Sequence, residues 1–381
     1  MFAPIARSAT AALLTLALPA QSRVWVVDDD ATAGTLPDIG AALAVATAGD
    51  TVLVKDGNYP SFSVNQPVAV LGDVGARVTV RGRVSVRIDD PGQALVMRNL
   101  FVRLFTGASP IWIADTRAPI LIEETDSFGW GSVLVEESAN LVLTRCTLWS
   151  SDITETAACV ARRSSAHVYG SSFTGSRGSE FYAPWPGAEI VGNAAMPAFF
   201  YAQGSRIASG GESLLYGHGL TALSTAGFGY RLEYLDSTFV EWYGLFGTAL
   251  PISTTGVGSV RETPADAVDF STVSPIREGG DTQLTFSGRQ GTQVFVIFAD
   301  TMLDAPLFLP QFGSSLLVAP AAIVPQGPIP SSGTLTVNLT APALPPGIDA
   351  STAYVQTVTV SPSGELVLGP LSTLTILDAR L

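Results

Sequence analysis

Five charged residues in the middle of the chain have the types and spacing that acid–base chemistry requires. They are Asp115, Glu136, Glu137, Arg162 and Arg163. Arg162 follows Glu137 by 25 residues and Glu136 follows Asp115 by about 21, so a chain that coils with such a period gathers all five on one side. Carboxylates beside guanidinium groups could then act as acid, base and calcium ligand in lyase chemistry. The alternative is a column of surface ion pairs, each worth about 0–1 kcal/mol.

A repeat in the sequence supports such a coil. When Leu134–Leu148 is written above Cys159–Phe173, which starts 25 residues later, apolar residues fall on apolar ones. The matched pairs are Leu141 with Ala166, Leu143 with Val168, and Leu148 with Phe173. A period of this length is typical of a solenoid, in which each turn buries its apolar side against its neighbours.

Aromatic residues concentrate in one later part of the predicted solenoid. Residues 181–246 hold 14 of the 33 Phe, Trp and Tyr residues of the chain. Flat rings with a polar atom suit stacking on sugar rings, so this segment supplies candidate substrate-binding residues. These are Trp185, Tyr201, Tyr216, Trp242 and Tyr243. The alternative is that most of these rings stack in the core or at a joint between domains.

The start of the solenoid carries a recognisable pattern. Pro37–Ala48 has apolar residues at helical spacing, with Asp38 at the expected helix start, and predicts a short helix that caps the open end. The strand that follows reads GDTVLVKDGNY from Gly49 to Tyr59. A helix followed by this motif resembles the entrance to right-handed parallel β-helix proteins of the pectin-lyase-like superfamily. The resemblance implies such a fold for residues 21–250, with any ligand along the outer face of the rod.

The pattern changes after residue 250. Residues 251–264 are rich in Gly, Ser and Thr without a clear period and predict a linker. Residues 265–381 contain seven short strand candidates separated by turns, which predicts a β-sandwich. This part contains no His, Cys, Lys or Trp and is poor material for catalysis. Its end is similar to C-terminal modules of secreted proteins from planctomycete-type bacteria, which implies export or surface attachment.

Composition and the N-terminus narrow the possible partners. Residues 1–20 combine Arg7 with a short apolar stretch and predict a secretory signal peptide; an uncleaved membrane anchor is the alternative. No later run is long and apolar enough for a transmembrane segment. The formal net charge of −13 argues against nucleic acid, and against an acidic polymer unless metal ions bridge the two. We therefore expect a secreted or cell-surface protein.

Three further features stay open at this stage. Cys146 and Cys159 are the only cysteines, and they either form one disulfide or remain two buried thiols. His167 lies between two inward residues and is expected on the surface. Asp28–Asp30 could bind a cation such as calcium, or form a solvated turn.

The sequence thus predicts an all-β protein, a parallel β-helix with a capping helix followed by a β-sandwich. The first functional hypothesis is recognition of an extracellular polysaccharide along the rod, with little or no catalysis. The second is a polysaccharide lyase or glycoside hydrolase that uses the charged cluster. The third is a structural or adhesive surface protein. Fold resemblance alone does not choose among them.

Overall fold

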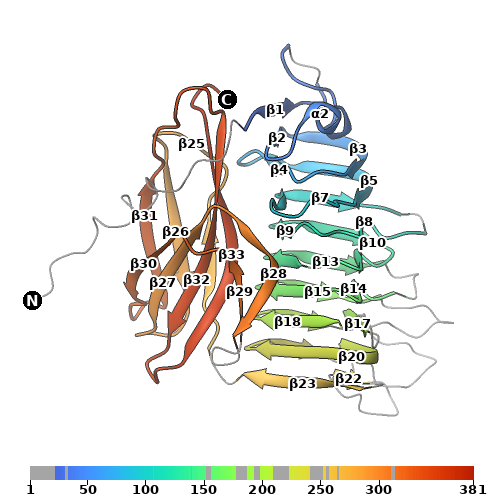
Figure 1. Ribbon diagram of the computed structural model, residues 1–381, viewed down its shortest axis with the longest axis vertical. Helices are drawn as coiled ribbons and strands as arrows, with labels where there is room; N and C mark the ends of the chain where they lie inside the picture. Colours follow the sequence, from blue (N-terminus) through green and yellow to red (C-terminus); the bar gives the residue numbers. More distant parts are fainter. Residues whose placement is uncertain are drawn as a thin grey trace, which may run out of the picture.

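The computed structural model describes residues 22–30, 33–105, 107–138, 140–151, 156–176, 187–192, 198–208, 223–240, 252–254, 257–263, 266–309 and 314–381. For most residues between 223 and 263 it describes the backbone alone. The predicted signal peptide, residues 1–20, lies outside this part. Two bodies stand side by side: a rod of stacked strands and a β-sandwich that runs along it (Figure 1).

The rod is a parallel β-helix whose turns contribute strands to three sheets. We call them the docking sheet, which the sandwich covers, the pocket sheet, which carries the pocket described below, and the third sheet. The docking sheet contains β1 (Val24–Val27), β2 (Thr51–Val54), β4 (Ala69–Gly72), β6 (Leu95–Arg98), β9 (Ile120–Glu123), β12 (Leu141–Thr144), β15 (Ser165–Tyr169), β18 (Phe199–Gln203), the end of β20 (Leu223–Leu235) and β23 (Val257–Thr263). The pocket sheet contains β7 (Leu100–Arg103), β10 (Asp126–Gly129), β13 (Thr147–Ser150), β16 (Ser172–Thr174), β19 (Arg206–Ala208) and β21 (Thr238–Val240). The third sheet contains β8 (Ile111–Ala114), β11 (Val133–Glu136), β14 (Cys159–Arg162), β17 (Ala188–Gly192), the start of β20, and β22 (Ile252–Thr254). Near the capped end, β3 (Gly57–Val64) and β5 (Val78–Val86) continue through both the pocket sheet and the third sheet.

The register confirms the predicted repeat in two of the sheets. Leu141 pairs with Ala166 and Leu148 with Phe173, as the 25-residue period predicts. In the third sheet Arg162 pairs with Glu136 and not with Glu137. The offset there is 26 residues, because Leu141 follows Glu136 by five positions whereas its partner Ala166 follows Arg162 by four.

A short helix covers the first turn of the rod. Helix α2 (Ile39–Val45) begins at Asp38, whose carboxylate accepts the backbone N–H of Ala41 at 2.7 Å. Ile39, Ala42 and Leu43 are buried in the core of the rod, so the predicted capping helix is confirmed. Within the described residues, no helix has the length and apolar character to cross a membrane.

The segment 251–264, expected as a linker, instead carries two strands of the rod. β22 and β23 pair in parallel with β20 and add another layer. The period was hard to see because these strands are short and rich in Ser, Thr and Gly. The described chain turns from rod to sandwich between β23 and Asp269, where β24 begins.

The C-terminal part is a β-sandwich, as predicted. One sheet contains β24 (Asp269–Thr272), β26 (Asp281–Ser287) and β31 (Thr334–Thr340); the other contains β25 (Ile276–Arg277), β33 (Leu366–Leu377), β32 (Ala350–Val360), β27 (Gln293–Ala299) and β30 (Ala322–Pro328). The strands β28 (Met302–Leu309) and β29 (Ser314–Val318) form a separate ribbon. Phe270 and Phe286 of the first sheet share a core with Val296 and Val355 of the second, which defines the sandwich.

The sandwich covers the outer face of the docking sheet. In β9, Ile120 and Ile122 point into the rod, while Leu121 between them packs outward in a second apolar cluster. That cluster joins Leu121 to Leu317 and Leu371 of the sandwich. Strands buried on both faces read as continuous apolar runs, and β9 and its neighbours have this character. The sandwich therefore covers the middle of the docking sheet.

Candidate functional site

The five predicted charged residues lie on one side of the rod but belong to three separate ion pairs. Arg162 contacts Glu136 at 3.1 Å and Arg163 contacts Glu137 at 2.5 Å, whereas Asp115 contacts Arg87 at 3.4 Å. These side chains are partly or largely exposed. The arrangement matches the alternative of a surface ion-pair column and forms no common centre.

Backbone geometry explains this separation. Asp115, Glu137 and Arg163 have φ values of 49°, 51° and 51° and occupy the same left-handed turn in successive layers. Glu136 and Arg162 precede two of these turns and project from the third sheet. Neighbouring parallel strands lie about 4.8 Å apart, so each carboxylate meets an arginine of an adjacent layer.

Glu136 has further polar neighbours on the third sheet. The indole N–H of Trp112 donates to Glu136 Oε2 at 3.3 Å. Burial raises the pKa of Glu189, and the nearby charge of Arg162 offsets only part of that effect. The third sheet thus holds one ion-paired carboxylate and a second one that retains its proton more readily.

The predicted aromatic residues do not form a described site. Tyr201 is buried, its hydroxyl donates to Gln203 Oε1 at 3.0 Å, and its ring lies 5.7 Å from that of Tyr169. The prediction of Tyr201 as a sugar platform is wrong, because the sandwich covers it. Trp185, Tyr216, Trp242 and Tyr243 lie outside the residues whose side chains are described.

His167 was expected on the surface and is fully buried. It projects from the outer face of the docking sheet, as its phase predicted, but the sandwich covers that face. Its ring lies 5.2 Å from that of Phe199 and 6.2 Å from that of Tyr201. Burial lowers the pKa of His167 to about 3.

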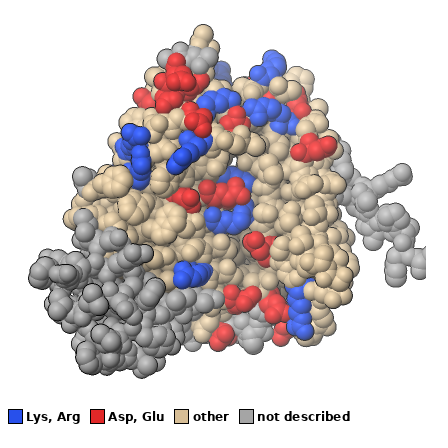
Figure 2. All heavy atoms as spheres, turned by 180° about the vertical axis from the view of Figure 1, so that it is seen from behind, with Lys and Arg blue, Asp and Glu red and all other residues tan. Residues whose placement is uncertain are grey.

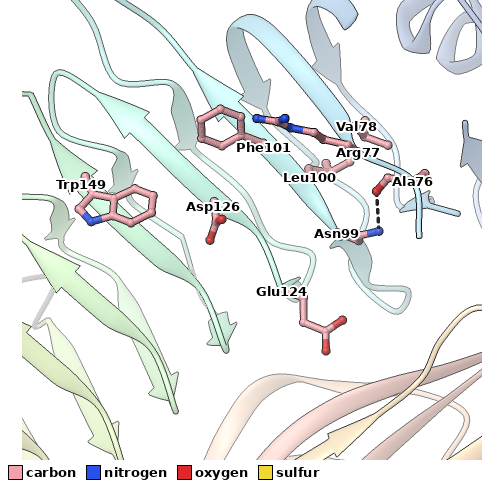
Figure 3. A pocket seen from close by; sticks show the side chains of 9 residues that line it. All are labelled: Ala76, Arg77, Val78, Asn99, Leu100, Phe101, Glu124, Asp126 and Trp149. Carbon is pink, nitrogen blue, oxygen red and sulfur yellow. Dashed lines mark hydrogen bonds between the residues drawn. The ribbon is translucent and has the colours of Figure 1, made fainter. Parts of the chain in front are cut away.

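An open pocket lies on the pocket sheet, next to the sandwich (Figure 3). It has a volume of about 400 Å³. Phe101 of β7 and Trp149 of β13 stand on either side of Asp126 of β10, and Glu124 projects from the turn before Asp126 toward the sandwich (Figure 3). Trp149 is 37% exposed, which is unusual for a side chain of its size. The pocket therefore offers two aromatic rings and two carboxylates to solvent.

The turn at Asn99 shapes the capped end of this pocket. Asn99 has a φ of 57°, which asparagine adopts more readily than most residues. Its side-chain amide donates to the carbonyl oxygens of Asp73 and Ala76 at 3.2 and 3.4 Å. These hydrogen bonds fix the neighbouring turn and with it the backbone that carries Arg77.

A basic hollow of about 250 Å³ adjoins the pocket and shares Arg77 and Phe101 with it. Arg81 and Arg103 also line it. The guanidinium carbon of Arg103 lies 6.0 Å from the centre of the Phe101 ring and 5.9 Å from that of Phe105, within cation–π range. Phe105 is 66% exposed, so the pocket sheet carries an aromatic belt beyond the pocket itself.

A buried ion cluster fixes the pocket floor to the sandwich. Glu123 lies between Arg98 and Arg145 at 3.1 and 2.6 Å, and both arginines also contact Glu124 at 2.9 Å. Burial by itself would raise the pKa of Glu123, but the two guanidinium charges and hydrogen bonds from the sandwich hold it below its usual value. Glu124 is thus held in place by two arginines.

The acidic turn Asp28–Asp30 places three carboxylates with ligand atoms within 4.8 Å of one another. Asp28 accepts the N–H of Asp30 at 3.2 Å, and Asp29 accepts that of Asn58 at 2.7 Å. The first contact lies within the turn, and the second joins the turn to β3.

Sequence reasoning missed the aromatic residues of the pocket, although one signal was present. Leu148 was correctly placed inward, and in a strand the next residue must point outward. Trp149 was therefore predictable as an outward tryptophan. Its partners Phe101 and Asp126 come from two earlier layers, so their proximity depends on the register.

Comparisons with known proteins add little to this description. No family model matches the chain, and no curated protein matches it in sequence. One solved structure, the pectin methylesterase from Aspergillus niger in a penultimately deglycosylated form, aligns with a TM-score of 0.38 and 12% identity over 66% of this chain and 92% of that chain. At that score the likeness supports no inference about activity, and the fold follows from the strand pairings.

Proposed function

We propose that this protein binds an extracellular polysaccharide in the pocket between Phe101 and Trp149. The observation that carries the proposal is the pair of aromatic side chains on either side of Asp126 in an open pocket. β10 separates β7 from β13, so these two strands lie about 9–10 Å apart along the rod. Trp149 lies two residues further along its strand than the position level with Phe101 and Asp126, so a ligand that reaches both rings must run diagonally across the strands.

The lining suits sugar chemistry. An aromatic ring covers the apolar face of a sugar, while carboxylates accept hydrogen bonds from its hydroxyl groups. Few polar groups beside an apolar surface are the usual composition of a ligand pocket. Asp126, between the rings, supplies the central acceptor.

The pocket favours binding over cleavage. Hydrolysis of a glycosidic bond requires two carboxylates with separate acid and base roles. Glu124 forms ion pairs with Arg98 and Arg145, so its carboxylate is already engaged by two cations. Asp126 is then the only carboxylate of the pocket without a recorded ion pair among the described residues. Secretion by a signal peptide would place this pocket outside the cell, where such polymers occur.

A glycan screen with a matched variant pair tests the proposal. The full chain, Trp149→Ala and Ile323→Ala are measured against neutral and acidic polysaccharides by affinity electrophoresis. Ile323 is 60% exposed on the sandwich, so its variant removes an exposed apolar side chain away from the pocket. Retardation by at least one polymer is expected for the full chain and Ile323→Ala and is lost in Trp149→Ala. Absence of retardation by every polymer contradicts the proposal and favours an adhesive or structural role.

A second candidate function, cleavage of a polysaccharide, rests on the third sheet. Glu189, with its raised pKa, could donate a proton, while Glu136 beside Arg162 supplies the second carboxylate. Release of reducing ends, or of unsaturated products absorbing in the ultraviolet, measures this activity. The activity is expected to disappear in Glu189→Gln and to remain in Glu137→Gln, and equal rates in both variants would exclude the assignment.

A further inference from the structure

One column of turns runs along the seam between the rod and the sandwich. Each turn leads from a strand of the docking sheet to a strand of the pocket sheet, and one residue in each has a positive φ. These residues are Asn99, Glu124, Arg145, Gly170, Gly204 and Asp236, with φ values of 57°, 48°, 52°, 52°, 56° and 45°. Seen from behind, charged side chains gather in the middle of the molecule, where the two bodies meet (Figure 2).

The pocket described above lies near the first turns of this column, and a second hollow lies near the last. The second hollow has a volume of about 250 Å³ and lies against Gly170, Gln203, Gly204, Asp236, Asp269 and Pro370. The two glycines bring no side chain to turns where the earlier layers carry Glu124 and Arg145. The missing side chains leave the space open.

Gln203 shows that the second hollow has an unused polar group. Its side chain is buried, with 2% exposure, and its Oε1 accepts the Tyr201 hydroxyl at 3.0 Å. Its Nε2 has no hydrogen-bond partner. If the amide is turned over, the oxygen is left instead, so one amide atom remains for a ligand in either orientation. The unpartnered atom has almost no surface open to solvent, so a ligand hydroxyl group pairs with this amide once the Gln203 side chain turns toward the hollow.

The carboxylates of the second hollow have spare acceptor capacity. Asp236 accepts one hydrogen bond from the N–H of Ala267 at 3.2 Å, and Asp269 accepts one from the N–H of Phe270 at 2.9 Å. A carboxylate has about four acceptor positions, so each can also accept from hydroxyl groups. Two acceptors and one amide donor match a sugar residue.

Arg145 connects the pocket with the second hollow. It binds Glu124 of the pocket at 2.9 Å and donates to the carbonyl oxygen of Phe270, next to Asp269. A Cβ atom placed on Gly170 would lie 3.7 Å from Arg145 Cγ and 3.3 Å from Asp269 Oδ1. Arg145 thus lies between Glu124 of the pocket and the turn at Gly170 that lines the second hollow.

We propose that the seam is one track for a linear, neutral polysaccharide and that the second hollow is a further sugar subsite at its far end. This inference rests on the proposed function. From Asn99 to Asp236 the track crosses five layer steps, which correspond to about 24 Å. Its charged groups are four carboxylates, Glu124, Asp126, Asp236 and Asp269, together with Arg77 at the capped end of the pocket and Arg145, which is already paired. Such a track accepts hydroxyl groups and repels an acidic chain.

The basic hollow predicts the opposite direction of binding for an acidic polysaccharide. An acidic polysaccharide would extend from the pocket toward Arg81 and Arg103 and away from Asp236. The direction in which a bound polysaccharide extends therefore depends on its charge. Binding measurements with neutral and acidic oligosaccharides distinguish the two directions.

The experiment measures affinity against oligosaccharide length by titration calorimetry. The neutral probes are cello-, xylo- and manno-oligosaccharides from disaccharide to octasaccharide, and the acidic probes are oligogalacturonates of the same lengths. The variants are Gly204→Asn and Asp269→Ala. Asparagine tolerates the positive φ of Gly204, and a Cβ atom there meets only Ala267 at 3.5 Å. Gly347→Asn, at another positive-φ glycine with open space around it, is the control.

The full chain is expected to bind the longest members of at least one neutral series about tenfold or more tighter than the shortest. Gly204→Asn and Asp269→Ala are expected to lose this gain and to keep the affinity for short members. Equal gains in the full chain and both variants overturn the track. Absence of binding to every neutral series, or tighter binding of oligogalacturonates that Arg81→Ala abolishes, also overturns it.

Failure of the proposed function gives a different result. In that case Trp149→Ala leaves the binding of short and long members unchanged. If Gly204→Asn does not fold, Asp269→Ala alone decides, because the side chain it truncates is exposed.

Discussion

Glu123 of the rod accepts hydrogen bonds from both the backbone N–H and the hydroxyl group of Thr373 in the sandwich, at 3.1 and 3.0 Å. The two residues are separated by 250 positions in the chain. Glu123 is fully buried and also binds Arg98 and Arg145. One carboxylate thus joins the docking sheet to the last long strand of the protein.

We expect Glu123→Ala to destabilise the whole protein. Removing one partner of a buried ion pair leaves charge without compensation and costs about 3–5 kcal/mol. Urea unfolding of the full chain measures this cost. Glu137→Ala, which removes a carboxylate from an exposed pair, is the control and is expected to cost about 0–1 kcal/mol. Equal stability of the two variants would show that the cluster contributes nothing to docking.

His167 makes stability dependent on pH. Its pKa is about 3 in the folded protein, against an ordinary value of 6.5. Between these values the unfolded chain binds a proton that the folded protein refuses, so stability falls as pH falls from 6.5 toward 3. The expected slope is about 1.4 kcal/mol per pH unit for one proton.

His167→Phe isolates this effect, because it keeps a ring beside Phe199 and removes the titrating group. Urea unfolding at several pH values should show a shallower decline for the variant than for the full chain. Parallel curves would mean that His167 gains a proton without unfolding.

Trp149 should contribute to ligand binding through its ring. Trp149→Ala is expected to weaken binding about tenfold, which corresponds to about 1.4 kcal/mol. Trp149→Phe retains an aromatic face and should recover part of the loss. Calorimetry with the best polysaccharide of the screen measures both variants. A phenylalanine variant as weak as the alanine variant would indicate that the indole N–H, and not stacking, contacts the ligand.

Cys146 and Cys159 should be unreactive in the folded protein. Both are buried free thiols, and burial raises the pKa of each to about 12. Thiolate is the reactive form, so a disulfide reagent at neutral pH should label neither residue before unfolding. In urea both should react at once. Labelling of one thiol in native buffer would reveal local opening of the rod near that layer.

The apolar pattern predicted the interior of the rod well. Leu141, Leu143 and Leu148 lie where the repeat placed them, because a side chain that points inward can only contact the same position in the next layer. The same logic failed at Glu137 and Arg162. One extra turn residue changes the register of a single sheet, and a turn on the surface leaves no apolar signature.

The contact between the sandwich and the rod was not predicted. The alternation of apolar residues predicted the strands of the sandwich but not the face of the rod that they cover. Val142 and Leu121 point outward, and their apolar character was the available signal that this face is covered. Because this cover was not predicted, Tyr201 and His167 were expected on the surface. The pocket lies beside the contact between the sandwich and the rod, so its position could not be predicted without that contact.

The closed docking sheet has a practical consequence for dividing the protein. A rod produced without residues 269–381 would present Ala69, Val96, Leu121 and Val142 to water as one continuous apolar stripe. Exposed stripes of this kind promote association between molecules. The two halves are therefore best regarded as a single folding unit, and fragments cut between them should precipitate unless both are present together.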